Sequence, residues 1–368
     1  MSPQPLRRLV GQLLIGSFSG SVIPVELRSL AREFDLGGVT LFGRLRNIES
    51  PQQVAELAFD VRALGRELPS WVGIDQEGGR VARLRSPFTE WPPMAVLGRS
   101  DDATLAGRFA AALATELSAV GISLDYAPVL DIHTNPKNPV IGDRALGENP
   151  ETVARLGRVI IEELQRAGVA ACGKHFPGHG DTATDSHHEL PLVEHPPDRL
   201  RAVEFVPFKA AIQAGVAFIM TAHVRVTSVD DERPATLSPR IVKGMLREEL
   251  GFTGVIVSDD LEMKAISNTH TPGEAAVEAI AAGCDSLLMC GVGDRADIER
   301  QAQALEAIVH AVEDQRLSVK QLEEALARNR HAKERFLREW RPPTEARLKS
   351  IIGSDKHRAI SEQMASFA

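Results

Sequence analysis

The chain has 368 residues, of which 43% are apolar and 25% are charged, and its 42 basic and 50 acidic side chains give a net charge of −8. This composition is ordinary for a globular protein with a large core. Without a basic cluster, nothing favours nucleic acid or an anionic membrane as a partner, and no run of 18 apolar residues predicts a membrane span.

The N-terminal segment MSPQPLRRLVGQLLIGSFSG holds a short apolar run, residues 9–15, behind Arg7 and Arg8. Gly11 and Gln12 interrupt the run, and no clear small-residue cleavage site follows it. We therefore interpret it as a first strand and not as a signal peptide. The cysteines have no framework spacing, which indicates reduced thiols in a cytoplasmic protein. They are Cys172, Cys284 and Cys290.

Short apolar runs of about strand length recur along the chain. Most lack alternation, as expected of strands that are covered on both sides. The eight runs are QLLIGS (12–17), GGVTLF (37–42), WVGID (71–75), LDYAPVLDI (124–132), VAACGKHF (169–176), AFIMTAHV (217–224), GVIVSDDL (254–261) and DSLLMC (285–290).

Helical patterns separate these runs. Capping residues precede proline at Asn149-Pro150 and at Ser238-Pro239, where two helices are expected to begin and run to about residues 167 and 250. The other predicted helices cover 102–121, 275–282 and two charged surface stretches within 295–339, broken near 316–318.

Eight strands that alternate with helices predict a parallel sheet. Closed on itself, this sheet is a (β/α)₈ TIM barrel. An open doubly wound sheet is the alternative, but no Rossmann fingerprint follows the first strand. We expect one catalytic domain over 1–340, followed by a polar tail over 341–368 with a short helix.

Polar side chains stand at the ends of several predicted strands, which is where barrels carry their chemistry. They are Asp75, Asp131, Lys174, His175, His223, Asp259 and Asp260. Asp259 follows a largely apolar run, and an unpaired carboxylate there would be costly to bury. It is either a helix cap or ion-pair partner, or a nucleophile or metal ligand. Asp260 should point elsewhere if the strand continues.

The stretch KHFPGHGDTATDSHHELP, residues 174–191, holds four histidines and three acids. In an extended segment, Asp185 and His187 would share a face, so the aspartate could orient the imidazole for proton transfer. An Asp-x-His pair is common by chance, and the signal alone is weak. Gly178 and Gly180 indicate a loop that bends.

Basic residues near the same strand ends could hydrogen-bond a polyhydroxylated ligand. Taken singly, each is as well interpreted as a charged side chain exposed to solvent. These are Arg80, Arg83, Arg85 and Arg144. The three cysteines and Trp71 are better interpreted as buried packing residues.

Three stretches, KHFPGHGDTATDSHHELP, GIDQEGGRVARLR and VIVSDDLEM, together resemble the bacterial β-N-acetylglucosaminidases of glycoside hydrolase family 3. The resemblance covers about residues 10–300 and is most specific to the single-domain cytoplasmic hexosaminidases of cell-wall recycling. It implies that Asp259 is the nucleophile, His187 the general acid/base and Asp185 its partner. It also implies that the N-acetylglucosamine unit is held by Asp75, Arg83, Arg144, Lys174 and His175.

The activity that this resemblance implies is retaining hydrolysis of a terminal β-linked N-acetylglucosamine by double displacement. It needs no metal or cofactor. Its implied substrates are muropeptide fragments such as N-acetylglucosaminyl-1,6-anhydro-N-acetylmuramic acid, with or without peptide, and we expect a monomer. The alternatives are a β-N-acetylglucosaminide phosphorylase, a sugar-binding protein without turnover, and a metal-dependent hydrolase. The last would use as ligands His175, His179, His187 and Asp259.

Overall fold

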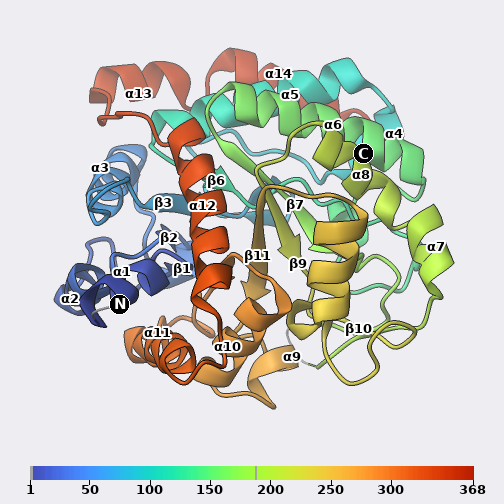
Figure 1. The fold of residues 1–368 in the computed structure, drawn as a ribbon. Helices are drawn as coiled ribbons and strands as arrows, with labels where there is room; N and C mark the ends of the chain where they lie inside the picture. Colours follow the sequence, from blue (N-terminus) through green and yellow to red (C-terminus); the bar gives the residue numbers. More distant parts are fainter. Residues whose placement is uncertain (1–2, 187–188) are drawn as a thin grey trace.

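The computed structural model describes residues 3–186 and 189–368. Within these residues, eight parallel strands close into a barrel in the order β1-β12-β11-β9-β7-β6-β3-β2 (Figure 1). Each lies inside one of the predicted runs, so the TIM-barrel prediction is confirmed and the open-sheet alternative is wrong. The strands are β1 (Leu14–Gly16), β2 (Gly38–Thr40), β3 (Trp71–Ile74), β6 (Leu124–Asp125), β7 (Ala170–Phe176), β9 (Phe218–Thr221), β11 (Val255–Asp260) and β12 (Ser286–Leu288).

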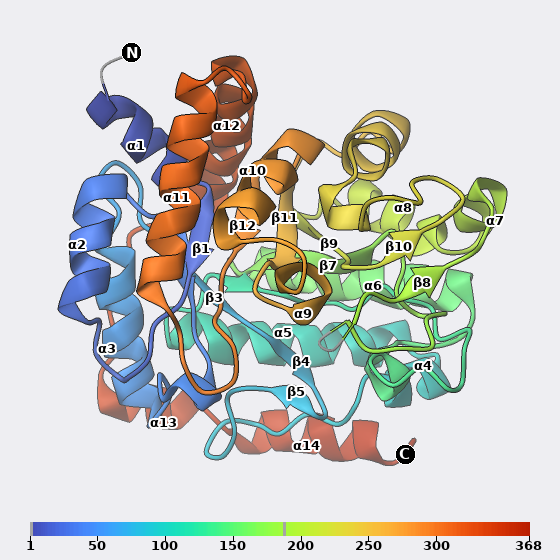
Figure 2. The ribbon, with the colours of Figure 1, turned by 90° about the horizontal axis from the view of Figure 1, so that it is seen from below.

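Helices form the outer layer of the barrel (Figures 1 and 2). The main ones are α2 (Val25–Phe34), α3 (Pro51–Arg62), α5 (Ala103–Ala119), α6 (Pro150–Arg166), α8 (Phe205–Gln213), η4 (Arg240–Glu249), α10 (Pro272–Ala282) and α11 (Ile298–Glu313). Short helices and turns join them: η1 (Gly43–Leu45), α4 (Ala95–Ser100), η2 (Gly142–Arg144), α7 (Pro197–Ala202), η3 (Ala235–Leu237) and α9 (Lys264–Ser267). Two small sheets pair β4 (Gln76–Gly78) with β5 (Val81–Ala82), and β8 (Leu192–Val193) with β10 (Arg225–Val226).

The amino-terminal end of the barrel is filled by large apolar side chains. Trp71 and Phe218 begin their strands and meet edge to face, with ring centroids 5.2 Å apart. Phe336, at the end of α12 (Val319–Phe336), lies against Trp71, so α12 covers this opening (Figure 1). The packing interpretation of Trp71 is supported by its complete burial. Because these apolar side chains fill the amino-terminal end of the barrel, the polar residues lie at the carboxyl ends of the strands.

Three sequence-based expectations need correction. Residues 3–11 form helix α1 (Pro3–Gly11) and not the start of a strand, because Leu6 and Val10 are buried at helical spacing. Ser238 does not cap η4, since its hydroxyl donates to Asp230 instead. The run 124–132 is a strand only at its start, and Pro128, which has no N–H to donate, interrupts regular pairing.

The C-terminal residues form two helices, α13 (Glu345–Ile351) and α14 (Asp355–Ala365), and both contact α5 (Figures 1 and 2). The buried carboxylate of Glu116 on α5 accepts hydrogen bonds from Gly353 and His357 and also from Thr89, in the segment between β5 and α4. This one side chain therefore ties the C-terminal segment to the barrel. The division into domain and tail at residue 340 stays a prediction.

In the two ranges that the structure covers, no helix combines the length and the apolar character needed to cross a membrane. The three cysteines are free and buried, and burial raises the pKa of each thiol, which fits their interpretation as packing residues.

Candidate active site

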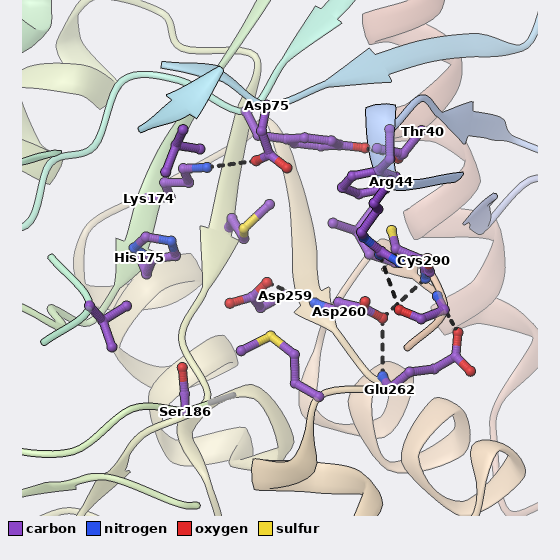
Figure 3. Close-up of a pocket in the computed structure, with 18 of the residues that line it drawn as sticks. Thr40, Arg44, Asp75, Lys174, His175, Ser186, Asp259, Asp260, Glu262 and Cys290 are labelled. Atoms are coloured by element: carbon purple, nitrogen blue, oxygen red, sulfur yellow. Dashed lines mark hydrogen bonds and ion pairs between the residues drawn. The ribbon is translucent and has the colours of Figure 1, made fainter. Parts of the chain in front are cut away.

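A cavity of about 590 Å³ opens among the carboxyl ends of the barrel strands (Figure 3). Its volume suits a small ligand. Six of the eight predicted site residues line it: Asp75, Arg83, Arg144, Lys174, His175 and Asp259. These residues come from four loops or strand ends that are up to 184 positions apart in the chain, and the barrel alone brings them together.

One wall of the cavity is a network of opposite charges. The Lys174 ammonium lies 2.9 Å from Asp75 Oδ1 and 2.7 Å from Glu77 Oε1. Arg83 Nη2 donates to Asp75 Oδ2 at 3.1 Å. Arg144 forms a two-pronged pair with Glu77, with Nε and Nη2 at 2.9 and 2.8 Å from the two carboxylate oxygens. Three cations thus face two anions, which leaves this wall with one excess positive charge.

The mutual pairing keeps Asp75, Glu77, Arg144 and Lys174 ionised. Burial alone would raise the pKa of Asp75 and Glu77, but Lys174 and the two arginines outweigh it. The pKa of Asp75 falls well below its usual range, and that of Glu77 falls to about 2. Burial would likewise lower the pKa of Lys174, and Asp75 and Glu77 raise it instead. The wall therefore presents fixed, charged hydrogen-bonding groups at any ordinary pH.

Asp259 and Asp260 at the end of β11 point in different directions, as strand alternation predicts. Figure 3 shows the Asp259 carboxylate in the middle of the cavity, between Asp75 and Lys174 on one side and Ser186 on the other. Asp260 turns toward β12, where its Oδ1 accepts from the amides of Glu262 and Cys290, both at 3.1 Å. Burial, with the neighbouring Glu262 carboxylate, raises the pKa of Asp260 to about 8.

His175 is oriented by a residue outside the predicted set. Its Nδ1 lies 2.6 Å from Asp131 Oδ2, and the other oxygen of Asp131 accepts from the amide of His179 at 2.6 Å. Burial alone would raise the pKa of Asp131, but its partners, chiefly His175, hold that pKa below its usual range. Asp131 therefore fixes the base of the long loop that follows β7.

That loop carries the remaining two predicted residues. Asp185 adjoins Ser186, which lines the cavity, and the Asp185 carbonyl accepts from the amide of Glu189 at 3.0 Å. His187 lies outside the described residues. Its role, and that of Asp185 as its partner, stay predictions.

Sequence reasoning missed two functional candidates that line the cavity, Glu77 and Glu262, and it did not assign a role to Asp131. Glu77 sits two residues after Asp75, a spacing that puts both on one face of an extended segment and that could have signalled it. His179 was considered only as a metal ligand. Nothing in the sequence marks Glu262, whose carboxylate accepts from the amide of Gly291 and pairs with Arg300.

Outside residues 1–2 and 187–188, no group of three or more His, Cys, Asp or Glu side chains is arranged to hold a metal ion. The Nδ1 atoms of His175 and His179 lie within hydrogen-bond distance of Asp131 and Thr182.

Comparison with known proteins gives consistent matches. The glycosyl hydrolase family 3 N-terminal domain matches residues 6–330. β-Hexosaminidase A of Pseudoalteromonas piscicida is 35% identical over 369 residues, which cover 94% of this chain but only 60% of that protein. The chain thus spans less than two thirds of that relative. β-Hexosaminidase of Pseudomonas aeruginosa strain PAO1 is 40% identical over 302 residues, which cover 81% of this chain and 87% of that protein.

Two solved structures extend the match to the fold. A glycoside hydrolase family 3 β-N-acetylglucosaminidase from Paenibacillus sp. FPU-7 superposes with a TM-score of 0.91 and 40% identity, covering 98% of this chain and 68% of that one. NagZ from Neisseria gonorrhoeae, in complex with N-trifluoroacetyl-D-glucosamine, superposes with a TM-score of 0.76 and 32% identity, covering 97% and 98% of the two chains.

Proposed function

The chain belongs to glycosyl hydrolase family 3, and from that premise we propose that it is an exo-acting β-N-acetylglucosaminidase that works with retention of configuration. The observation that carries the proposal is a carboxylate, Asp259, set at a strand end in a 590 Å³ cavity that also holds the charged wall of Asp75, Glu77, Arg144 and Lys174. Asp259 provides a nucleophile, and the charged wall provides a binding surface for a sugar. The hexosaminidase relatives support the choice of N-acetylglucosamine.

In the proposed reaction, an oxygen of Asp259 attacks the anomeric carbon and the bond to the leaving oxygen breaks. His187, in its protonated imidazolium form, gives a proton to that oxygen and becomes neutral, so the aglycone leaves as an alcohol and the sugar remains as an ester on Asp259. Water then attacks the same carbon while His187 takes its proton, and the ester bond breaks. Asp185 orients the imidazole and stabilises its charged form.

Histidine has a physical advantage over a second carboxylate in this role. Asp75, Glu77 and Asp259 already line the cavity. An imidazole is either neutral or positively charged, so it adds no further negative charge beside a sugar that a carboxylate must attack. It would equally tolerate phosphate as acceptor, which is why a comparison of rates with and without phosphate separates hydrolase from phosphorylase.

The proposed substrates are peptidoglycan fragments, with N-acetylglucosamine linked to 1,6-anhydro-N-acetylmuramic acid with or without peptide, and the proposed place is cell-wall recycling in the cytoplasm. The resemblance of the sequence motifs supports this assignment, and the similarity to β-hexosaminidases supports its N-acetylglucosamine part. The volume of the cavity is larger than that of one sugar ring, so a disaccharide can enter it.

Trapping with a fluorinated, mechanism-based N-acetylglucosaminide, followed by peptide mapping, tests reaction class and nucleophile together. We expect the label on Asp259, and its loss in Asp259→Asn. The matched variant Asp260→Asn should still be labelled, because that side chain faces β12. A sugar ester on any other residue, or no ester in an active enzyme, would contradict the proposal.

A further inference from the structure

The imidazole of His179 joins the base of the loop after β7 to its far end. The ring is 1% exposed. Its Nδ1 lies 2.8 Å from Thr182 Oγ1, and its Nε2 lies 3.1 Å from Ser186 Oγ. Its own amide is held by Asp131 at 2.6 Å, and Asp131 also orients His175. One side chain therefore connects the sugar-binding end of β7 to the residue between Asp185 and His187.

The hydrogen bonds around Thr182 determine which ring nitrogen carries the proton. The Thr182 hydroxyl donates its single proton to the His179 carbonyl at 3.0 Å, and it accepts from Asn138 Nδ2 at 3.2 Å. Having no second proton, Thr182 must accept from His179 Nδ1, so Nδ1 is the protonated nitrogen. Nε2 then carries the lone pair, and the Ser186 hydroxyl donates to it.

The neutral form of the ring fits its surroundings. Burial lowers the pKa of His179 to about 4, although the Asp131 carboxylate opposes the change. The ring thus keeps one donor and one acceptor throughout the neutral range, and the Ser186 contact keeps its direction.

Ser186 is anchored from a second side. Its carbonyl accepts from the amide of Ala265 in α9 at 3.3 Å, and α9 follows the strand that carries Asp259. Ser186 is 2% exposed and lines the cavity (Figure 3). The loop is also tightly packed at its base, since a Cβ on Gly180 would lie 1.8 Å from the carbonyl oxygen of Ile132.

We propose that His179 and Ser186 are positioning residues for the proton-transfer step. The Nδ1-protonated imidazole of His179 accepts a hydrogen bond from Ser186 and so holds Ser186, the residue that precedes His187 in the chain, at the cavity lining. This inference rests on the proposed function, because it needs His187 as the acid/base. A displacement of about 1 Å in a reacting group can cost on the order of 100-fold in rate.

Kinetics of Ser186→Ala on two substrates test the proposal. Cleavage of the disaccharide needs protonation of a poor leaving group, whereas an activated aryl glycoside does not. We expect kcat/KM for the disaccharide to fall roughly 10- to 100-fold, and kcat/KM for the aryl glycoside less than about 3-fold. On the aryl substrate kcat and KM should fall together, because water attack lacks a well-placed base and the glycosyl-enzyme accumulates. Ser186→Thr, which keeps the hydroxyl, should restore most of the lost rate.

The matched control is Ser228→Ala. The Ser228 hydroxyl donates to the carbonyl of His195, outside the cavity lining, and its loss should leave both rates unchanged. His179→Gln is the second variant and should reproduce the Ser186→Ala pattern more severely. Unchanged rates in Ser186→Ala, or equal losses on both substrates with a raised KM, would overturn the proposal.

Two further measurements separate this inference from the proposed function. His187→Ala should also lower kcat/KM more for the disaccharide than for the aryl glycoside, and by a larger factor than Ser186→Ala does. An equal loss on both substrates would remove the acid/base role and this inference with it. Hydrogen exchange of peptides from 177–190 tests the anchoring directly. It should be faster in Ser186→Ala than in Ser228→Ala, and unchanged exchange would overturn the anchoring even if His187 behaves as proposed.

Discussion

Arg144 has a structural role in the cavity wall, apart from its proposed role in sugar binding. Its side chain is 10% exposed and its guanidinium pairs with the Glu77 carboxylate, which is 1% exposed, so the pair stabilises the wall of the cavity. Removal of the guanidinium leaves Glu77 with Lys174 as its remaining cation among those that the structure records. The pair is therefore a structural part of the cavity in the absence of any ligand.

We predict that Arg144→Ala lowers the free energy of unfolding by about 3–5 kcal/mol, since one partner of a buried ion pair is lost. Arg158→Ala is the control, because its partner Glu162 lies on the exposed face of α6 and the cost should be within about 1 kcal/mol. Urea unfolding of both variants gives the comparison. Equal, small losses would show that Glu77 finds another partner.

Asp260 should make stability depend on pH in an unusual direction. Its pKa is raised to about 8 in the folded protein, chiefly by burial, against about 3.9 in an unfolded chain. Between these values the folded state holds a proton that the unfolded state has lost. The stabilisation is complete below about pH 4 and is lost as the pH rises through about 8.

We predict that Asp260→Asn removes this dependence. The free energy of unfolding of the wild type, relative to the variant, should fall between pH 5 and 8 by at most about 1.4 kcal/mol per pH unit. Comparison with the variant is needed because burial also raises the pKa of Asp125, to about 7, in the same window. Parallel stability curves for the two proteins would show that Asp260 is ionised in the folded state.

At the scale of elements, the C-terminal helices brace the segment that leads from Arg83 to α4. Glu116 receives four hydrogen bonds, two from Thr89 and one each from Gly353 and His357. The burial of Leu348, Ile360 and Met364 adds apolar contact to the same surface. The Thr89 segment and the C-terminal helices should therefore loosen together.

We predict that Glu116→Gln lowers the free energy of unfolding by about 1–3 kcal/mol, because an amide cannot accept all four bonds and leaves buried donors unpaired. Hydrogen exchange should rise in two separate stretches, around 85–92 and 345–365. The control is Glu162→Gln on the exposed face of α6, which should alter neither stretch. Faster exchange in only one stretch would show that Glu116 does not couple them.

At the scale of the whole molecule, the barrel divides its interior between stability and chemistry. Aromatic side chains fill the amino-terminal end, and charges gather at the carboxyl end. The charged side chains of the wall are held in place by their direct pairing with one another, and the proposed hydrolysis assigns no step to a metal ion.

We predict that turnover survives exhaustive treatment with a chelator, with less than about a twofold change in kcat/KM after the chelator is removed. Metal content of the purified protein is measured beside the rate. A loss of activity that added zinc restores would favour the metal-dependent hydrolase with His175, His179, His187 and Asp259 as ligands.

The sequence by itself determined the parallel sheet and favoured its closure into a barrel over an open sheet. Unbroken apolar runs separated by helices indicate a parallel sheet that is covered on both sides. Asn149, Asp102 and Thr271 cap their helices through local hydrogen bonds. The N-terminal helix was mistaken for a strand because a short apolar run fits both periods, and only the burial of Leu6 and Val10 distinguishes them.

The tertiary structure alone decided the partners of the charged residues. Lys174 lies 99 positions from Asp75 and Arg144 lies 67 positions from Glu77, and neither pairing follows from local sequence. Ser238 shows the same limit, since a capping residue was diverted to Asp230 by the fold. Periodicity and capping act over a few residues, whereas ion pairs depend on barrel closure, which brings distant strand ends to one rim.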